Sequence, residues 1–108
     1  MNAINLKFGQ YDTAPTQEFL LTRKRVVVDL TDAQVYFNLK SLTTGAVKID
    51  NRLCAVTDAF GGKCQVTWQT GDFDTIGDFK GTIVIKYLDG RQESFRDIVI
   101  TVEERPAL

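Results

Sequence analysis

Apolar and polar residues alternate along most of the chain, and a period of two is typical of half-buried β-strands. Residues 34–41 show it clearly, because Val35, Phe37 and Leu39 alternate with polar or amphipathic neighbours. No window longer than a turn or two has the i, i+3, i+4 spacing of an amphipathic helix. The pattern predicts strands at residues 3–9, 17–22, 25–30, 34–41, 46–50, 53–57, 63–69, 78–88 and 91–103.

Turn-forming residues lie between these segments. Asp89-Gly90 is a pair that accepts the positive φ angles of a tight hairpin, and Thr44-Gly45 and Gly61-Gly62 mark two more turns. Many short antiparallel strands in about 100 residues are typical of a β-sandwich. We therefore expect one all-β domain over residues 1–108, with a flexible tail at 103–108.

The apolar side of each alternation predicts the core between the two layers of such a sandwich. The expected buried residues are Phe37, Val66, Trp68, Ile83, Ile85 and Ile100.

Composition narrows the function classes. The chain has 108 residues, of which 13 are basic and 14 acidic. A nucleic-acid binder normally carries a basic excess, and no window approaches the roughly 20 apolar residues of a membrane span. Histidine is absent, which removes the commonest general base and most zinc sites. We expect no catalytic residue, cofactor, metal, nucleic-acid partner or membrane partner.

Cys54 and Cys64 occupy inward-facing positions on what the pattern predicts to be neighbouring strands of a hairpin turning at residues 58–62. Two such thiols can come within the roughly 4.4–6.8 Å Cα separation of a disulfide. The N-terminus lacks the basic start and apolar block of a signal peptide, so we expect synthesis in a reducing cytoplasm. The prediction is two spatially adjacent thiols that stay mostly reduced.

Three surface segments are candidates for contact with a partner. Residues 23–25 form the one basic run, which either tips a solvated hairpin or meets a partner. Phe60, beside two glycines, is either folded over the rim of the sandwich or offered to a partner. Residues 72–78 carry three carboxylates without the ordered oxygen spacing of a calcium loop, which favours turn chemistry over a metal site. The candidate contact residues are Arg23, Lys24, Arg25, Phe60, Lys63, Phe73 and Asp74.

A set of short motifs follows in a fixed order along residues 5–103. The motifs are Asp12-Thr13-Ala14-Pro15, Val28-Asp29-Leu30-Thr31, Val56-Thr57-Asp58-Ala59, Val66-Thr67-Trp68, Gly77-Asp78-Phe79 and Asp89-Gly90. In that order and spacing the chain resembles the immunoglobulin-like N-terminal domain of the phage baseplate upper protein family. Asp32 and Phe79 stand where the family commonly has a glycine and a tyrosine.

The resemblance implies an immunoglobulin-like antiparallel β-sandwich of about seven to nine short strands. It also implies a virion structural or adaptor protein of the tail, baseplate or neck. Such a protein would be assembled in the bacterial host cytoplasm and would dock onto other virion proteins and copies of itself in a symmetric assembly. Family members often continue into coiled-coil or fibre-like regions, whereas this chain ends at Leu108, so we expect a stand-alone protein without a long receptor-reaching arm.

Two other functions remain open from the sequence. One is a capsid decoration protein clamped onto the head lattice. The other is a carbohydrate- or receptor-binding module, since sugar sites usually display exposed aromatic rings. The candidate rings are Tyr11, Tyr36, Phe60 and Phe73.

Overall fold

The computed structural model describes residues 4–12 and 16–104, apart from the side chain of Asp97. The described residues form ten β-strands and no helix, which confirms the all-β prediction. No helix among them could cross a membrane. The strands are β1 Ile4–Gly9, β2 Gln17–Leu20, β3 Thr22–Arg23, β4 Val26–Val27, β5 Gln34–Ser41, β6 Val47–Leu53, β7 Ala55–Asp58, β8 Lys63–Val66, β9 Gly77–Lys86 and β10 Gln92–Glu103.

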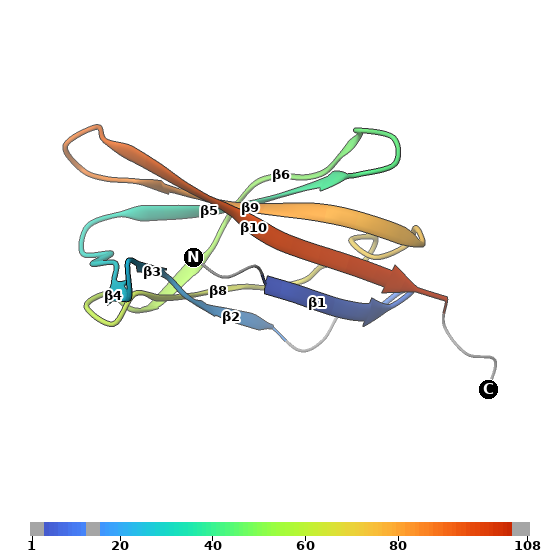
Figure 1. Cartoon of the computed structure of the whole chain (residues 1–108), viewed down its shortest axis with the longest axis horizontal. Coiled ribbons are helices and arrows are strands. Elements are labelled where there is room, and N and C mark those ends of the chain that lie inside the picture. The colour runs from blue at the N-terminus through green and yellow to red at the C-terminus, as the bar shows by residue number, and fades with distance from the viewer. Residues whose placement is uncertain (1–3, 13–15, 105–108) are drawn as a thin grey trace.

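The strands form two layers that face one another (Figure 1). One layer is a five-stranded sheet in the order β1-β10-β9-β5-β6, and the other is a three-stranded sheet in the order β2-β8-β7. Neighbouring strands are antiparallel except β1, which runs parallel to β10. The chain changes layer between β6 and β7, at Cys54. The short β3–β4 hairpin stands apart as its own pair.

The core lies between the layers, where the inward residues of each alternation meet. All six residues predicted to be buried are at most 4% exposed. The central strand β9 needs a glycine at its middle, because a Cβ on Gly81 would lie 2.9 Å from Ile98 Cγ2 and 3.2 Å from the Phe37 ring. The missing side chain thus leaves room for a large aromatic in a close-packed interior.

One predicted strand is mostly wrong. Of residues 25–30, only Val26–Val27 pair as a strand. Beyond them, Leu30 donates its backbone N–H to Ala59 O at 2.8 Å, and the chain turns. Asp32 in this turn has φ +58°, a left-handed conformation that glycine adopts without strain. The apolar residues of this segment predicted a strand, but beyond Val27 the backbone N–H groups of Val28 and Leu30 donate to Leu21 O and Ala59 O.

Other boundaries differ less. β8 ends at Val66, three residues before the predicted end of the strand at residue 69. At the C-terminus β10 continues to Glu103, so that residue belongs to the sheet and not to the predicted tail. Residues 105–108 of that tail lie outside the described residues.

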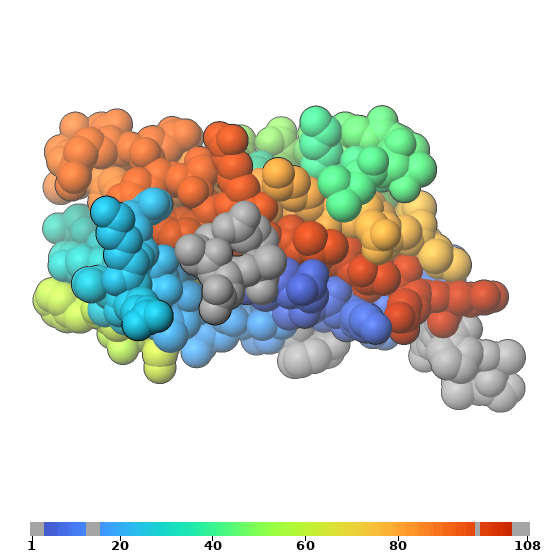
Figure 2. Space-filling view, viewed as in Figure 1, coloured from blue at the N-terminus to red at the C-terminus, as the bar shows by residue number. Residues whose placement is uncertain are grey.

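The turns gather at two opposite ends of the sandwich (Figures 1 and 2). The β3–β4, β7–β8 and β9–β10 turns lie at one end, which we call the Phe60 end. The β5–β6 hairpin and the loop between β8 and β9 lie at the other, which we call the Asp74 end. This grouping follows from the register, since Gln34 pairs with Lys86 at one end of β5 and Ser41 pairs with Phe79 at the other.

Candidate functional site

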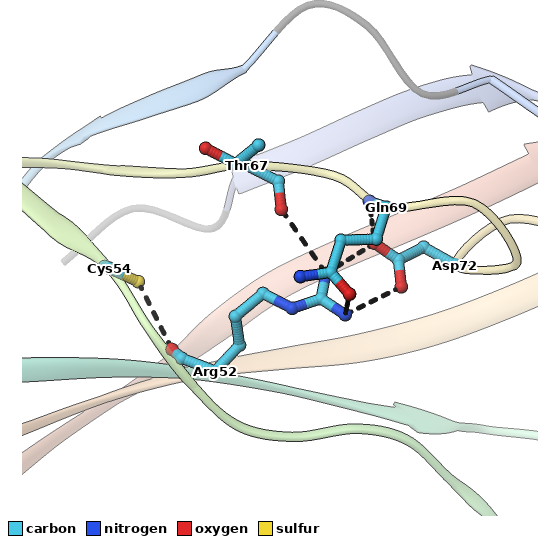
Figure 3. Close-up of polar contacts among 5 residues, drawn as sticks. All are labelled: Arg52, Cys54, Thr67, Gln69 and Asp72. Carbon is cyan, nitrogen blue, oxygen red and sulfur yellow. Dashed lines mark hydrogen bonds and ion pairs between the residues drawn. The ribbon is translucent and has the colours of Figure 1, made fainter.

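The most buried charged contact of the described residues joins the two layers at the Asp74 end (Figure 3). Arg52, on β6, donates to both carboxylate oxygens of Asp72 in the β8–β9 loop, with Nη2 3.0 Å from Oδ1. Arg52 also donates to Gln69 Oε1 at 3.2 Å and Thr67 O at 3.4 Å. The backbone N–H of Gln69 donates to Asp72 Oδ2 at 2.6 Å. We call this group the Arg52–Asp72 clamp.

The clamp has the chemistry of a structural contact. Asp72 is 5% exposed, and both of its oxygens already accept hydrogen bonds. A bidentate arginine–carboxylate pair fixes geometry as well as charge. Cys54 lies beside it, with its Sγ 3.8 Å from Arg52 O. These contacts hold the β8–β9 loop against β6 and leave no free base or nucleophile in the group.

The other carboxylates predicted in the 72–78 loop point to separate partners. Asp74 pairs with the Lys48 ammonium, whose hydrogen bond lowers the pKa of Asp74 from its ordinary value, and Thr75 lowers it further. Asp78 accepts from the Thr101 hydroxyl at 2.8 Å. Within residues 4–12 and 16–104, no three potential metal ligands converge. Each of the three carboxylates in the loop therefore has its own separate partner, which is Arg52, Lys48 or Thr101.

Both cysteines are buried free thiols. The register pairs Cys64 with Val56, and Cys54 lies two residues before Val56, directly before β7 begins. Burial raises the pKa of Cys54 to about 11, with Arg52 opposing it. Burial raises the pKa of Cys64 to about 12, and the nearby Cys54 adds to this shift. Such thiols are poor nucleophiles, because the thiolate is the reactive form. Their reduced state in the native protein stays a prediction.

Phe73 is placed in the core, which corrects its selection as a surface contact. Its side chain is 1% exposed and stacks on Phe8 with ring centroids 4.4 Å apart. Trp68 meets both rings edge-on, at 5.4 and 4.9 Å. Its place in the 72–78 loop made it a candidate contact, but the ring is buried, as is the neighbouring Asp72. An aromatic cluster is therefore the role of Phe73.

Phe60 is 76% exposed at the tip of the β7–β8 turn. The turn itself is held firmly, because Ala59 O and Gly62 O accept backbone hydrogen bonds from Leu30 and Leu21, each at 2.8 Å. Gly62 has φ +69°, and a Cβ there would lie 2.8 Å from Leu21 O. Of the two readings of Phe60, the structure therefore shows an exposed ring on a well-anchored turn.

The basic run forms the tip of the β3–β4 hairpin at the same end. Lys24 and Arg25 have φ angles of +51° and +68°, as a tight hairpin turn requires, and both are exposed. Arg23 is engaged, since its guanidinium pairs with Glu93 at 2.5 Å and lies 5.0 Å from the centre of the Phe95 ring. The available charges of this hairpin are thus the two at its tip.

Further exposed apolar residues lie at the Phe60 end, and the sequence reading missed them. Val26 and Val27 are 67% and 44% exposed on β4, and Leu88 is 83% exposed in the β9–β10 turn. A signal for Leu88 was present, because it directly precedes the Asp89-Gly90 pair of the turn. Lys63, exposed at the start of β8, also belongs to this end, whereas Asp74 lies in the β8–β9 loop at the other.

The four aromatic candidates for a sugar site are scattered. Phe73 is buried, and Phe60 lies alone at its end. Tyr36 lies on the outer face of the five-stranded sheet, where Lys86 Nζ is 5.2 Å from its ring centre. Tyr11 is 59% exposed, and its backbone N–H donates to Phe73 O at the Asp74 end. The exposed rings do not share one face.

Comparison with known families decides the membership. The family model for the BppU N-terminal domain, the N-terminal domain of the baseplate upper protein, matches residues 1–105. The chain belongs to this family. The BppU family is one of phage baseplate proteins, so the chain is a phage baseplate-associated structural protein, as the resemblance implied. No curated protein matches the sequence at a significant level.

Proposed function

We propose that this BppU-family domain is a virion adaptor that docks through its Phe60 end onto a neighbouring protein of a symmetric baseplate assembly. The observation that carries the proposal is the 76% exposure of Phe60 on an anchored turn. Exposed apolar surface that gathers in one region, especially with polar residues around it, marks a site of interaction with a partner. In a family of baseplate proteins, that partner is another virion protein.

The surroundings of Phe60 fit an interface. Val26 and Leu88 add apolar surface at the same end, and Lys24 and Arg25 supply charge at its margin. Interfaces commonly combine a few aromatic or arginine anchors with a polar rim. Because the turn is already fixed by backbone hydrogen bonds, docking orders little additional chain, and pre-organisation of this kind favours affinity.

The proposal extends to how the domain acts. It works by fixed contact and turns over no substrate, since the chain has no histidine and its buried charged pair is fully occupied. Copies in a closed symmetric assembly meet neighbours through the same patches repeatedly. Assembly in the host cytoplasm also suits two buried thiols.

The test is Phe60→Ala in the phage genome, with copies of the chain per purified particle counted by quantitative mass spectrometry. Loss of an interface aromatic costs about 2 kcal/mol or more, which is roughly 30-fold in affinity. We expect particles depleted of the chain. The matched control is Leu42→Ala, which removes a 56% exposed apolar side chain from the β5–β6 hairpin at the opposite end.

The free energy of unfolding of both purified variant proteins should lie within about 0.5 kcal/mol of the parent's, because neither side chain is packed. Parental copy numbers with Phe60→Ala would refute docking through this end. In parental particles we expect a copy number that is a multiple of three or six. Copies in the hundreds would instead indicate decoration of the head lattice and would refute a baseplate position.

A further inference from the structure

The middle of the outer face of the five-stranded sheet carries a cluster of positive charge that the Phe60 end does not use. We call it the cationic face and define it by nine outward residues of β5, β9 and β10. Its cations are exposed and its uncharged members are half-buried. The face consists of Lys40, Lys80, Lys86 and Arg96 around Tyr36, Asn38, Thr82, Val84 and Ser94. Two acids on outward positions, Asp78 and Glu103, lie beside it near strand ends, where Asp78 accepts a hydrogen bond from Thr101 and Glu103 pairs with Lys7.

Register fixes how these residues lie. Lys40 and Lys80 are directly opposite one another on the antiparallel strands β5 and β9. Directly opposite side chains have Cβ atoms about 5 Å apart, and like charges in that position destabilise a sheet. No ion pair involving these two lysines is found among the side chains that the structure describes.

Protection of a sheet edge does not explain the lysines. Charged residues, lysine above all, are commonly used to keep edge strands from pairing with other chains. β9 is the central strand of its sheet, and β5 is also interior, so neither presents an edge. The rule broken here is the one against like charges directly opposite on neighbouring strands. Such local violations are expected at functional or strained sites.

The cationic face is hollowed at its centre, which bears on the kind of partner that it fits. Asn38, Thr82, Val84 and Ser94 form the floor of a shallow hollow, and Lys40, Lys80 and Arg96 also line it. The hollow is therefore apolar at one point, able to make hydrogen bonds at several, and surrounded by positive charge. A folded surface with carboxylates fits a broad mixed face of this kind, whereas a polyanionic strand is bound along a charged groove.

We propose that the cationic face is a second docking surface, and that its occupant is a carboxylate-rich surface of a different virion protein. Complementary charge fixes orientation and suppresses wrong partners. The inference rests on the proposed virion role but not on the Phe60 end. A domain with two separate contact surfaces can join two neighbours.

Lys40→Glu gives opposite results for a structural and a docking role. It replaces a like-charge cross-strand pair by an opposite-charge pair with Lys80, so the isolated protein should melt about 2–4 °C higher. In particles the same change should lower the incorporated copy number about tenfold or more, because an acid then faces acids. The control exchanges an exposed pair at the sheet edge, K7E/E103K, and should assemble normally.

A chemical experiment identifies the occupant in purified parental particles. A zero-length carbodiimide cross-linker joins lysine amines to carboxylates in ion-pair contact. We expect Lys40 or Lys80 to be linked to aspartate or glutamate of another virion protein, and both lysines to resist acetylation that labels them in the free protein. Changing the linked acid to lysine should restore incorporation of Lys40→Glu.

Each contrary outcome has a distinct meaning. Full acetylation of Lys40 and Lys80 in particles that contain the chain would overturn the inference and leave the proposed function standing. So would links only to another copy of this chain, protection lost after nuclease treatment, or parental incorporation of Lys40→Glu. Particles without the chain would refute the proposed function, and this inference with it.

Discussion

Removing the guanidinium of Arg52 should destabilise the domain more than loss of any exposed ion pair. In Arg52→Ala, the carboxylate of Asp72, which is 5% exposed in the parent protein, keeps only the backbone N–H of Gln69 as a donor. The cost of burying its charge is then no longer offset by the positive charge of the guanidinium. The β8–β9 loop also loses its tie to β6.

The magnitude follows from burial. The side chains of Arg52 and Asp72 are 18% and 6% exposed, so solvent screens the pair little. Breaking a buried pair by removing one partner costs about 3–5 kcal/mol. Asp72→Ala should cost less, about 2–3 kcal/mol, which is in the range for loss of hydrogen bonds to a charged group. The cost is smaller because the long side chain of Arg52 can turn its charge towards water. The double variant should cost less than the sum of the two, with a coupling of about 2 kcal/mol.

Urea unfolding followed by the fluorescence of Trp68 measures these differences, since the chain has one tryptophan and its ring is 4% exposed. The matched control is Lys7→Ala, which breaks the pair with Glu103 at 3.8 Å, where both side chains are more than half exposed. An exposed pair contributes about 0–1 kcal/mol. Arg52→Ala and Lys7→Ala should therefore differ several-fold in effect.

Two results would refute this reasoning. One is a loss below about 1 kcal/mol for Arg52→Ala, which would mean that the clamp opens to water in solution. The other is strict additivity of the single and double variants, which would mean that the two side chains act independently.

Two further predictions concern the core. Trp68→Ala should lower the free energy of unfolding by about 3–5 kcal/mol, because its ring contacts three phenylalanines. Thermal melting followed by circular dichroism measures the loss. A fluorescence emission spectrum of the parent protein that is typical of a water-exposed indole would contradict the buried placement of Trp68. Cys54 and Cys64 should both take up an alkylating label without reductant once the chain is denatured, and intact mass showing no label would indicate a disulfide. The folded pKa values of the two thiols, about 11 and 12, exceed the ordinary 9.0. The stability that the neutral thiols contribute is therefore complete below pH 9 and is lost as the pH rises from 9 through the folded pKa values. A C54A/C64A variant should lose this component of the decline in stability at alkaline pH, and an unchanged decline would contradict it.

Much of the fold could be read from the sequence because side-chain period and strand geometry are both local. Val35, Phe37 and Leu39 face inward by alternation alone, and the structure buries all three. Turn pairs such as Asp89-Gly90 also act locally, through allowed φ angles, and the turn there has Gly90 at +92°. The exposed ring of Phe60 follows in part from the two glycines beside it.

The remainder depended on contacts between residues far apart in the chain. Residues 25–30 are mostly apolar, as in a strand, but Leu30 donates its backbone N–H to Ala59, which lies in a distant turn. Phe73 stands between two aspartates in the sequence, and its ring is buried against Phe8 and Trp68, which are distant in the chain or across a loop. Neither outcome is encoded in a short window.

The sequence by itself determined the all-β class, the inward side of most strands, the exposed turns and the order of motifs typical of the family. The tertiary structure decided which turns share an end, placing Phe60 beside the basic hairpin and Asp74 opposite. It also decided that Lys40 and Lys80 lie face to face on two interior strands. Periodicity gives each residue a side of its own strand, whereas proximity between strands depends on register and sheet order, which only the packed layers fix.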